Sequence, residues 1–170
     1  SSKTIGVIIP DVVHYFFSTV ISGIEDVLYE RDYNMILCQS NEMQEQEVKN
    51  IRTLLSSRVD GIMASVSKST TNFDHYRSII EKNIPLVFFD RSVEELDADS
   101  VVIDDETGAY KATIHLLRSG KKRIVHLSGP QQLAIARNRL SGYLRAMKEY
   151  RLTPEEEDIV KCDDIYSAER

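Results

Sequence analysis

The feature that most constrains this chain is a regular alternation of two hydrophobic patterns along its whole length. Short continuous apolar runs have the length of buried strands, and the segments between them repeat apolar residues at helical spacing. Such strands, separated by helices, are typical of a parallel sheet that is buried on both faces. The sequence therefore predicts an α/β fold, a doubly wound parallel sheet with helices on both faces. We predict strands over residues 4–10, 34–38, 61–64, 85–89, 100–103, 123–127 and 159–162, and helices over residues 16–31, 44–57, 72–83, 105–119 and 133–150.

Charge and cysteine content limit what the chain can do. The net charge of the 170 residues is −6 and the basic clusters are short, so we expect no strong binding to nucleic acid by this chain itself. No apolar run approaches the roughly 20 residues of a membrane helix. Cys38 and Cys162 lie far apart without a second cysteine or a histidine at metal-site spacing, which indicates small apolar residues in a reducing compartment.

The ends of the predicted strands exclude several enzyme classes. The turn after the first strand, "PDVVHYFFS", has no glycine, so it does not fit a dinucleotide site, and the chain lacks the GxxxxGK[ST] phosphate loop. "HLSGP" around Ser128 is not a nucleophile elbow. No group of histidines, cysteines and carboxylates has metal-site spacing. We predict that the protein is not an enzyme, and we expect no cofactor and no metal.

Aromatic, acidic and arginine side chains remain at the carboxyl ends of the strands, where open α/β sheets bind ligands. Aromatic rings cover the C–H face of a sugar, and arginine and aspartate supply donors and acceptors for neighbouring hydroxyls. The pattern therefore favours a polyhydroxylated ligand.

Ordered segments of the chain resemble a known family. "IGVIIPDVVHYFFSTVISGIEDVLYERDYNMILCQS", "LLSSRVDGIM", "IPLVFFDR", "VVIDDETGAYKATIHLLRSGKKRIVHLSGP" and "ARNRLSGYLRAM" together are similar to the effector-binding domain of the LacI/GalR transcriptional regulators. The resemblance covers nearly the whole chain and implies a type I periplasmic-binding-protein-like fold. In that fold two α/β subdomains, joined by crossover strands, hold a ligand in the cleft between them.

The resemblance also implies ligand-binding residues. The family's "NPFF" is replaced by His14-Tyr15-Phe16-Phe17, whose phenylalanines would pack on the ligand ring, and His14 in place of asparagine changes one polar contact. We expect Phe16 to face the ligand, Phe17 to anchor both helix and pocket, and Tyr15 to lie at the rim.

Four charged residues complete the implied ligand set. Asp90 and Arg91 match the Asp-Arg pair that binds sugar hydroxyls in the sugar-binding relatives. Asp105 stands where the family often has Asn or Asp facing the cleft. Arg139 matches the arginine three residues before the glycine of "ARNRLSGY", the strongest ligand contact of this half.

Simpler structural roles remain open for several of these residues. Phe16 and Phe17 also fit an ordinary core, and Asp90 also fits the turn after its strand. Arg91 also fits a surface ion pair. Arg139 lies near the start of a predicted helix, where the dipole disfavours a cation, so ligand contact is the better interpretation there.

The resemblance implies a fragment of a longer protein. We predict that residues 3–154 form the amino-terminal subdomain, that 155–170 form a linker and the start of the second subdomain, and that the helix-turn-helix and hinge lie outside the chain. The implied function is the ligand-sensing domain of a cytoplasmic, homodimeric transcriptional regulator. It would bind a sugar or similar small metabolite, couple lobe closure to operator affinity, contact DNA only through the helix-turn-helix, and contact no membrane. The alternative is a periplasmic sugar-binding protein of a transport system.

Overall fold

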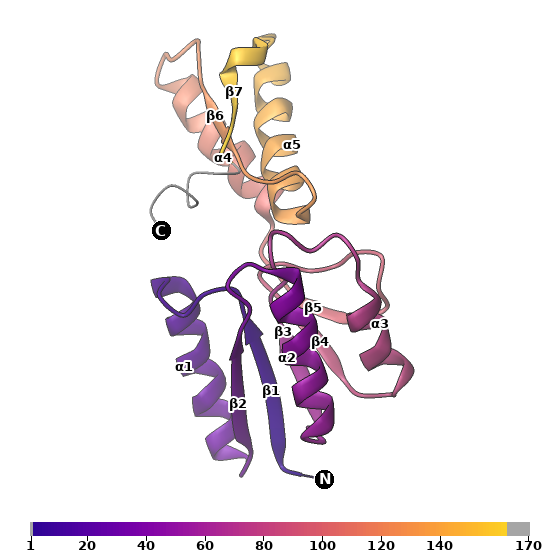
Figure 1. Ribbon diagram of the computed structural model, residues 1–170. Helices are drawn as coiled ribbons and strands as arrows, with labels where there is room; N and C mark the ends of the chain where they lie inside the picture. The colour runs from indigo at the N-terminus through magenta and orange to yellow at the C-terminus, as the bar shows by residue number, and fades with distance from the viewer. Residues whose placement is uncertain (1, 163–170) are drawn as a thin grey trace. The chain divides into compact units, whose positions relative to one another are not determined.

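A computed structural model of the protein describes residues 2–162 (Figure 1). Within the chain, contacts group into two compact units, which we call unit 1 (up to Val102) and unit 2 (from Ile103). The elements of unit 1 are β1 (Thr4–Ile9), α1 (Tyr15–Glu30), β2 (Asn34–Gln39), α2 (Gln44–Ser56), β3 (Gly61–Ala64), α3 (Asp74–Glu81), β4 (Leu86–Phe89) and β5 (Asp99–Val101). Those of unit 2 are α4 (Asp105–Arg118), β6 (His126–Ser128), α5 (Ala134–Glu149), the 3-10 helix η1 (Glu156–Asp158) and β7 (Ile159–Lys161).

Unit 1 is a five-stranded sheet in the order β2-β1-β3-β4-β5, and every neighbouring pair is parallel. Ile5 is paired with both Met35 of β2 and Gly61 of β3. Because the chain proceeds from β1 outward to β2 and then returns to the other side of β1, the order reverses between β1 and β3. Ligands of open α/β sheets bind outside the carboxyl ends of the strands at such a reversal.

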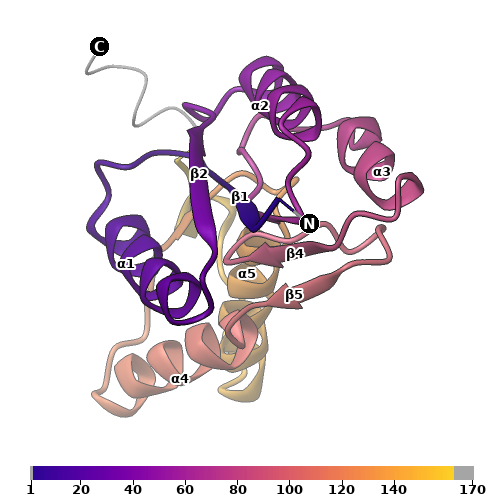
Figure 2. The ribbon, with the colours of Figure 1, turned by 90° about the horizontal axis from the view of Figure 1, so that it is seen from below.

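Helices cover both faces of this sheet, as predicted. Figure 2 shows α1 on one face and α2 with α3 on the other. The face under α2 and α3 carries the larger apolar cluster, which includes Ile8, Ile51, Ile62 and Phe88. Gly6 allows α2 to come close, because a Cβ added there would lie 2.6 Å from Cδ1 of Leu54.

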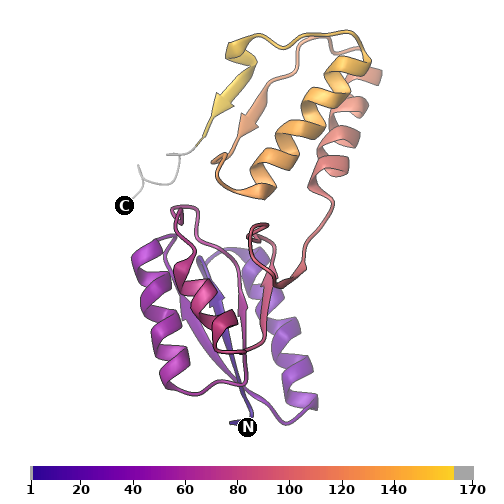
Figure 3. The same ribbon diagram turned by 90° about the vertical axis from the view of Figure 1, so that its right-hand side faces the viewer.

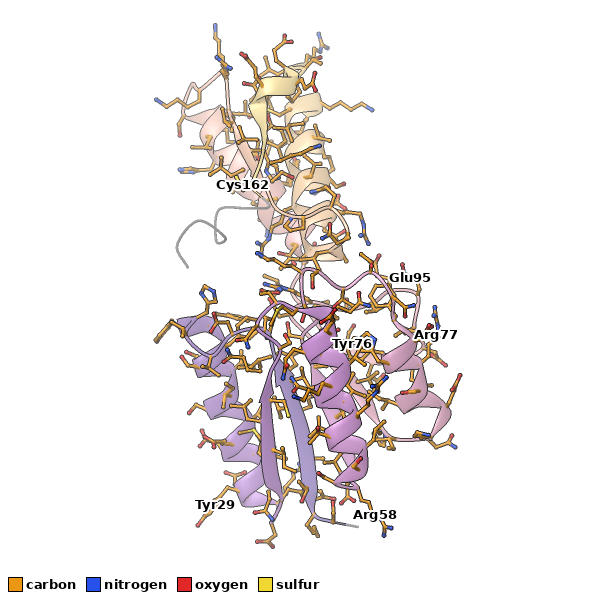
Figure 4. All side chains as sticks on the ribbon, viewed as in Figure 1. Tyr29, Arg58, Tyr76, Arg77, Glu95 and Cys162 are labelled. Atoms are coloured by element: carbon orange, nitrogen blue, oxygen red, sulfur yellow. The ribbon has the colours of Figure 1, made fainter. Side chains whose placement is uncertain are left out.

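The face under α1 has its own apolar cluster, which contains Val7, Ile9, Phe17 and Phe89. At the carboxyl end of α1, Tyr29 points away from the body of unit 1 (Figure 4). Among residues 2–162, no helix combines the length and apolar character needed to cross a membrane.

Unit 2 packs α4 and α5 side by side against a two-stranded parallel sheet of β6 and β7 (Figure 3). Its core includes Ile114 and Leu117 from α4 and Tyr143 and Met147 from α5. The two helices touch at Gly142, where an added Cβ would lie 2.1 Å from the carbonyl oxygen of Glu106. On the other side of the sheet Leu127 is 69% exposed.

Two features of the architecture differ from the predicted arrangement. The predicted strand 123–127 does not extend the main sheet: it forms β6 and pairs with β7. The contacts also divide the chain after Val102, within the span 3–154 that was predicted as one subdomain. The hydrophobic pattern shows that a strand follows a helix, but it carries no information on which sheet that strand joins. Part of the predicted terminal segment, residues 163–170, lies outside the described residues.

Candidate functional site

The first turn of α1, directly after the loop that follows β1, places the two phenylalanines in different environments. Phe17 is 4% exposed and its ring packs edge-on to Phe89, with centroids 6.5 Å apart. Phe16 is 52% exposed, with its ring centroid 5.2 Å from that of Phe17, and Tyr15 is 85% exposed. Phe17 therefore belongs to the core under α1, while Phe16 presents an apolar ring at the surface of the first turn of α1.

The same loop is tied to the end of β2 by polar contacts. The backbone N–H of Val12 donates to Oε1 of Gln39 at 3.1 Å, and Nε2 of Gln39 donates to Oδ1 of Asn41. His14 is the N-cap residue of α1, and its carbonyl oxygen accepts from the N–H of Ser18 at 3.2 Å. Its side chain does not cap the helix. These contacts fix the loop between β1 and α1, and with it the helix start that carries Phe16, at the carboxyl end of β1.

Asp90 and Arg91 follow β4 at the same edge of the sheet. Asp90 has a positive φ of 61°, a conformation that costs energy for a residue with a Cβ. Nη1 of Arg91 donates to the carbonyl oxygen of Val66 at 3.2 Å, and the Arg91 carbonyl accepts from the N–H of Val66 at 3.3 Å. Nε of Arg91 lies 3.8 Å from Oδ2 of Asp90. Arg91 thus joins the loop after β3 to the loop after β4.

Glu42 is a partner of Arg91 that the sequence did not single out. Nη1 of Arg91 lies 2.9 and 2.8 Å from the two carboxylate oxygens of Glu42, and the N–H of Lys68 donates to Oε2 at 2.7 Å. Glu42 stands in a turn in which both central residues, Asn41 and Glu42, have positive φ, at 53° and 60°. The ion-pair alternative for Arg91 is therefore realised, with an acid 49 residues away in sequence.

A second glutamate of this region is fully buried. Glu47 of α2 is 0% exposed, and its carboxylate accepts from the N–H of Ser67, from Oγ1 of Thr70 and from Nε2 of His75, each at 2.8 Å. The Nε2–H tautomer of His75 suits this contact, because an ionised carboxylate only accepts. Burial and the negative charge of Glu47 raise the pKa of Tyr76 well above its ordinary value. This network holds the loop after β3 against α2.

Unit 2 pairs the other two predicted ligand residues with each other. Nε of Arg139 in α5 donates to Oδ1 of Asp105 at 2.7 Å. The Asp105 side chain is 6% exposed, whereas the Arg139 side chain is 51% exposed. Asp104 caps α4 by accepting from the N–H of Thr107 at 2.9 Å. Asp105 therefore acts first as the partner that orients Arg139.

Two neighbours of Arg139 have structural tasks. Arg137 donates to the carbonyl oxygens of Gln131 and Gln132 at 3.1 and 2.9 Å, which holds the turn before α5. The ring of His126 stacks on Tyr143, with centroids 5.2 Å apart. Burial, and then the positive charge of Arg139, lower the pKa of His126 below its ordinary value of 6.5.

The structure distributes the seven predicted site residues over both units. His14, Phe16, Phe17, Asp90 and Arg91 belong to unit 1, whereas Asp105 and Arg139 belong to unit 2. Within residues 2–162, no three side chains of histidine, cysteine, aspartate or glutamate are grouped closely enough to hold a metal ion. Both cysteines are free thiols, and burial raises the pKa of Cys38. The arrangement offers rings, carboxylates and oriented guanidinium groups, which is binding chemistry.

Comparison with known proteins agrees with this description. The family described as periplasmic binding proteins and sugar binding domain of the LacI family matches residues 2–170. The HTH-type transcriptional repressor PurR of Vibrio atlanticus (strain LGP32) is 34% identical over 169 residues, which cover 96% of this chain and 50% of the repressor. The chain thus spans about half the length of the curated relatives it matches.

Solved structures give the same result. The transcription regulator CcpA of Lactococcus lactis superimposes with a TM-score of 0.85 at 30% identity, over 93% of this chain and 58% of that one. A periplasmic binding protein/LacI transcriptional regulator from Alkaliphilus metalliredigens QYMF, complexed with D-xylulofuranose, superimposes with a TM-score of 0.80 at 28% identity. The match covers 94% of this chain and 56% of that one. The resemblance found in the sequence is confirmed: the chain belongs to the family of periplasmic binding proteins and LacI-type sugar-binding domains.

Proposed function

We propose that the chain is the effector-sensing part of a LacI-type transcriptional regulator, which binds a sugar or a similar small metabolite. The observation that carries this proposal is the family match along residues 2–170, with a transcriptional repressor among the relatives at 34% identity. The sugar in the complex of the Alkaliphilus metalliredigens protein supports the ligand class. DNA contact would come from a helix-turn-helix outside the 170 residues, since the chain is acidic.

Both units supply effector-binding residues in this proposal. In unit 1 the exposed ring of Phe16 would cover an apolar face of the ligand, and Asp90 and Arg91 would bind its hydroxyl groups. In unit 2 Arg139, oriented by Asp105, would donate to the ligand. Phe17 and His14 would support these contacts by fixing the first turn of α1.

The division after Val102 suggests how the chain fits the two-subdomain fold. Unit 1 would be the amino-terminal subdomain, and unit 2 would be the first part of the second subdomain, whose sheet the rest of the protein would complete. The exposure of Leu127 on the open face of the β6–β7 sheet supports this assignment. An effector would change affinity for DNA only by binding one arrangement of the subdomains better than another.

Homodimerisation in the cytoplasm belongs to the same proposal. Val27 and Tyr29 on α1 are 51% and 86% exposed, and Leu37 on β2 is 39% exposed. Apolar residues of this kind on the first helix and its neighbouring strand favour a protein partner there. Binding without catalysis is supported by the relatives, which are named as regulators. These names also favour the regulator over the transport alternative.

Isothermal titration of the full-length protein with neutral pentoses and hexoses, and with their monophosphates, tests the proposal. We expect at least one compound to bind, and Arg139→Gln to weaken it by about tenfold or more, because a charged donor is lost. Arg145→Gln is the matched control, since Arg145 is on the same helix and also pairs with an acid of α4, Glu106. Failure of every compound to bind would contradict a sugar-sensing role.

A second experiment separates the regulator from the transport protein. The full-length protein is mixed with DNA fragments from around its own gene, and retention is measured with and without the bound sugar. A regulator retains particular fragments and responds to the sugar, whereas a transport protein retains none.

A further inference from the structure

We propose that Glu42 is a specificity-determining residue that makes this protein prefer an uncharged polyhydroxylated effector to a phosphorylated one. The inference rests on the proposed function and concerns the ligand class of the same site. It depends on which N–H donors of Arg91, and how much of its positive charge, are available to a ligand once its contacts within unit 1 are made.

Nη1 of Arg91 is fully used inside the protein. Its two hydrogens serve both carboxylate oxygens of Glu42, at 2.9 and 2.8 Å, and the Val66 carbonyl at 3.2 Å. The side chains of Arg91 and Glu42 are 19% and 22% exposed, so water screens this pair less than it screens a surface pair. The positive charge of Arg91 is therefore balanced before any ligand arrives.

The other edge of the guanidinium group keeps its donors. Within the described residues, no hydrogen bond uses Nε or Nη2 of Arg91, and Nε is 3.8 Å from Oδ2 of Asp90, beyond hydrogen-bond range. These two nitrogens form a fork of parallel N–H groups. The fork lies beside a carboxylate, so donors and an acceptor stand next to each other at the carboxyl end of β4.

This combination distinguishes hydroxyls from phosphates. A hydroxyl group both donates and accepts, so it satisfies the fork of Arg91 and the Asp90 carboxylate together. An ionised phosphate only accepts, and it would place its negative charge beside Asp90 and Glu42. The side chains of Glu42, Asp90 and Arg91 sum to −1, and inclusion of Lys68, whose backbone contacts Glu42, brings the sum to zero. The cluster has no surplus positive charge for an anion.

Unit 2 follows the same pattern on its own. Arg139 is paired with the Asp105 carboxylate at 2.7 Å, and Asp105 is almost completely buried. Each of the two arginines implicated in effector binding is thus neutralised by an acid of its own unit. Glu42 differs from Asp105 because it stands in a turn with two successive positive φ angles, a conformation retained against its intrinsic cost.

The test compares neutral sugars with their phosphates on the full-length protein. Isothermal titration uses D-ribose, D-xylulose, D-fructose and D-glucose, each beside its monophosphate. In the wild type we expect a neutral sugar to bind at least about tenfold more tightly than its phosphate. Glu42→Gln removes the charge and keeps an acceptor for Arg91 and Lys68. It should lower the ratio of the two dissociation constants, phosphate over neutral sugar, severalfold. Raising the salt concentration should narrow the wild-type ratio as well, by screening the repulsion.

Glu45→Gln is the matched control, because it removes an equal charge from an exposed, neighbouring position in the first turn of α2. It should leave the ratio unchanged. A merely structural role of Glu42 would weaken both members of a pair equally, and this result would overturn the inference. Phosphates that bind the wild type as tightly as the neutral sugars, or more tightly, would overturn the inference and leave the sensing function standing. Failure of all eight compounds to bind would remove the proposed function itself.

Discussion

Replacement of Glu47 by alanine should destabilise unit 1 more than any surface change on the same helix. The Glu47 carboxylate is fully buried and accepts three hydrogen bonds, from Ser67, Thr70 and His75. Removal of the acceptor leaves three donors on residues that are buried from solvent, Ser67, Thr70 and His75. The loop after β3 would lose its attachment to α2.

The size of the effect follows from these contacts. A hydrogen bond to a charged group contributes about 1.5–3 kcal/mol, and loss of one partner of a buried pair costs about 3–5 kcal/mol. The three bonds share one carboxylate and are not additive, so we expect Glu47→Ala to lower the free energy of unfolding by about 3–5 kcal/mol. With a urea dependence of about 2 kcal/mol/M, the midpoint would fall by about 2 M.

Glu47→Gln gives a smaller, predictable loss. Its amide oxygen can take the position of Oε1 and still accept from Thr70 and His75, but its NH₂ group then faces the N–H of Ser67. Two buried N–H donors that face each other without an acceptor lower the free energy of unfolding by about 1–3 kcal/mol. This variant remains measurable even where the alanine variant unfolds.

The assay is urea unfolding followed by circular dichroism, with Glu45→Ala as the control. Glu45 is exposed on the first turn of the same helix and should contribute less than about 1 kcal/mol. Amide hydrogen exchange should localise the lost protection to residues 67–75. A Glu47→Ala protein with the midpoint of the control, or with unchanged protection of that loop, would refute the reasoning.

Three further predictions concern unit 2. Gly142→Ala should cost at least about 2 kcal/mol, because its Cβ would lie 2.1 Å from the carbonyl oxygen of Glu106 and force α4 and α5 apart. Gly108→Ala, at the first turn of α4 with nothing within 4 Å of the added Cβ, should instead stabilise by up to about 0.5–1 kcal/mol in the same unfolding assay. Because the pKa of His126 is lowered in the folded state by burial and by Arg139, the folded protein binds fewer protons than the unfolded chain just below pH 6.5. The contribution of neutral His126 to the stability of the fold is therefore present above that pH and is lost as the pH falls. The free energy of unfolding of His126→Gln should fall less between about pH 7.5 and 5.5 than that of the wild type.

The sequence predicted the local elements well and the grouping of the strands less well. Apolar residues at strand and helical spacing respond to local burial, so every predicted strand and helix is present within a few residues of its expected ends. The assignment of the strand near residue 126 to the main sheet was wrong because a βα unit has the same pattern in either sheet. The residues of β6 do not show that this strand pairs with β7 and not with β5.

The buried glutamate illustrates a signal that was present in the sequence but not used. In the helix predicted over residues 44–57, the structure buries Glu47, Asn50, Ile51 and Leu54. Positions 47, 50, 51 and 54 lie on one helix face, three or four residues apart. A charged residue on the face that also carries Ile51 and Leu54 predicts a buried polar network, and donors from residues 67–75 bind this carboxylate.

The candidate site shows what a sequence cannot supply without tertiary structure. Arg91 and Arg139 are identified by the family resemblance, Arg91 just after a strand and Arg139 near the start of a helix. An arginine beside a ligand site is commonly taken to bind an anion. Their partners, Glu42 and Asp105, are 49 and 34 residues away, and nothing local connects the members of either pair. The partner nevertheless decides the chemistry: an unpaired guanidinium attracts a phosphate, whereas one already held by a carboxylate offers only directed N–H groups. The ligand class of this protein therefore depends less on the arginines that the motif supplies than on the acids that the fold places beside them.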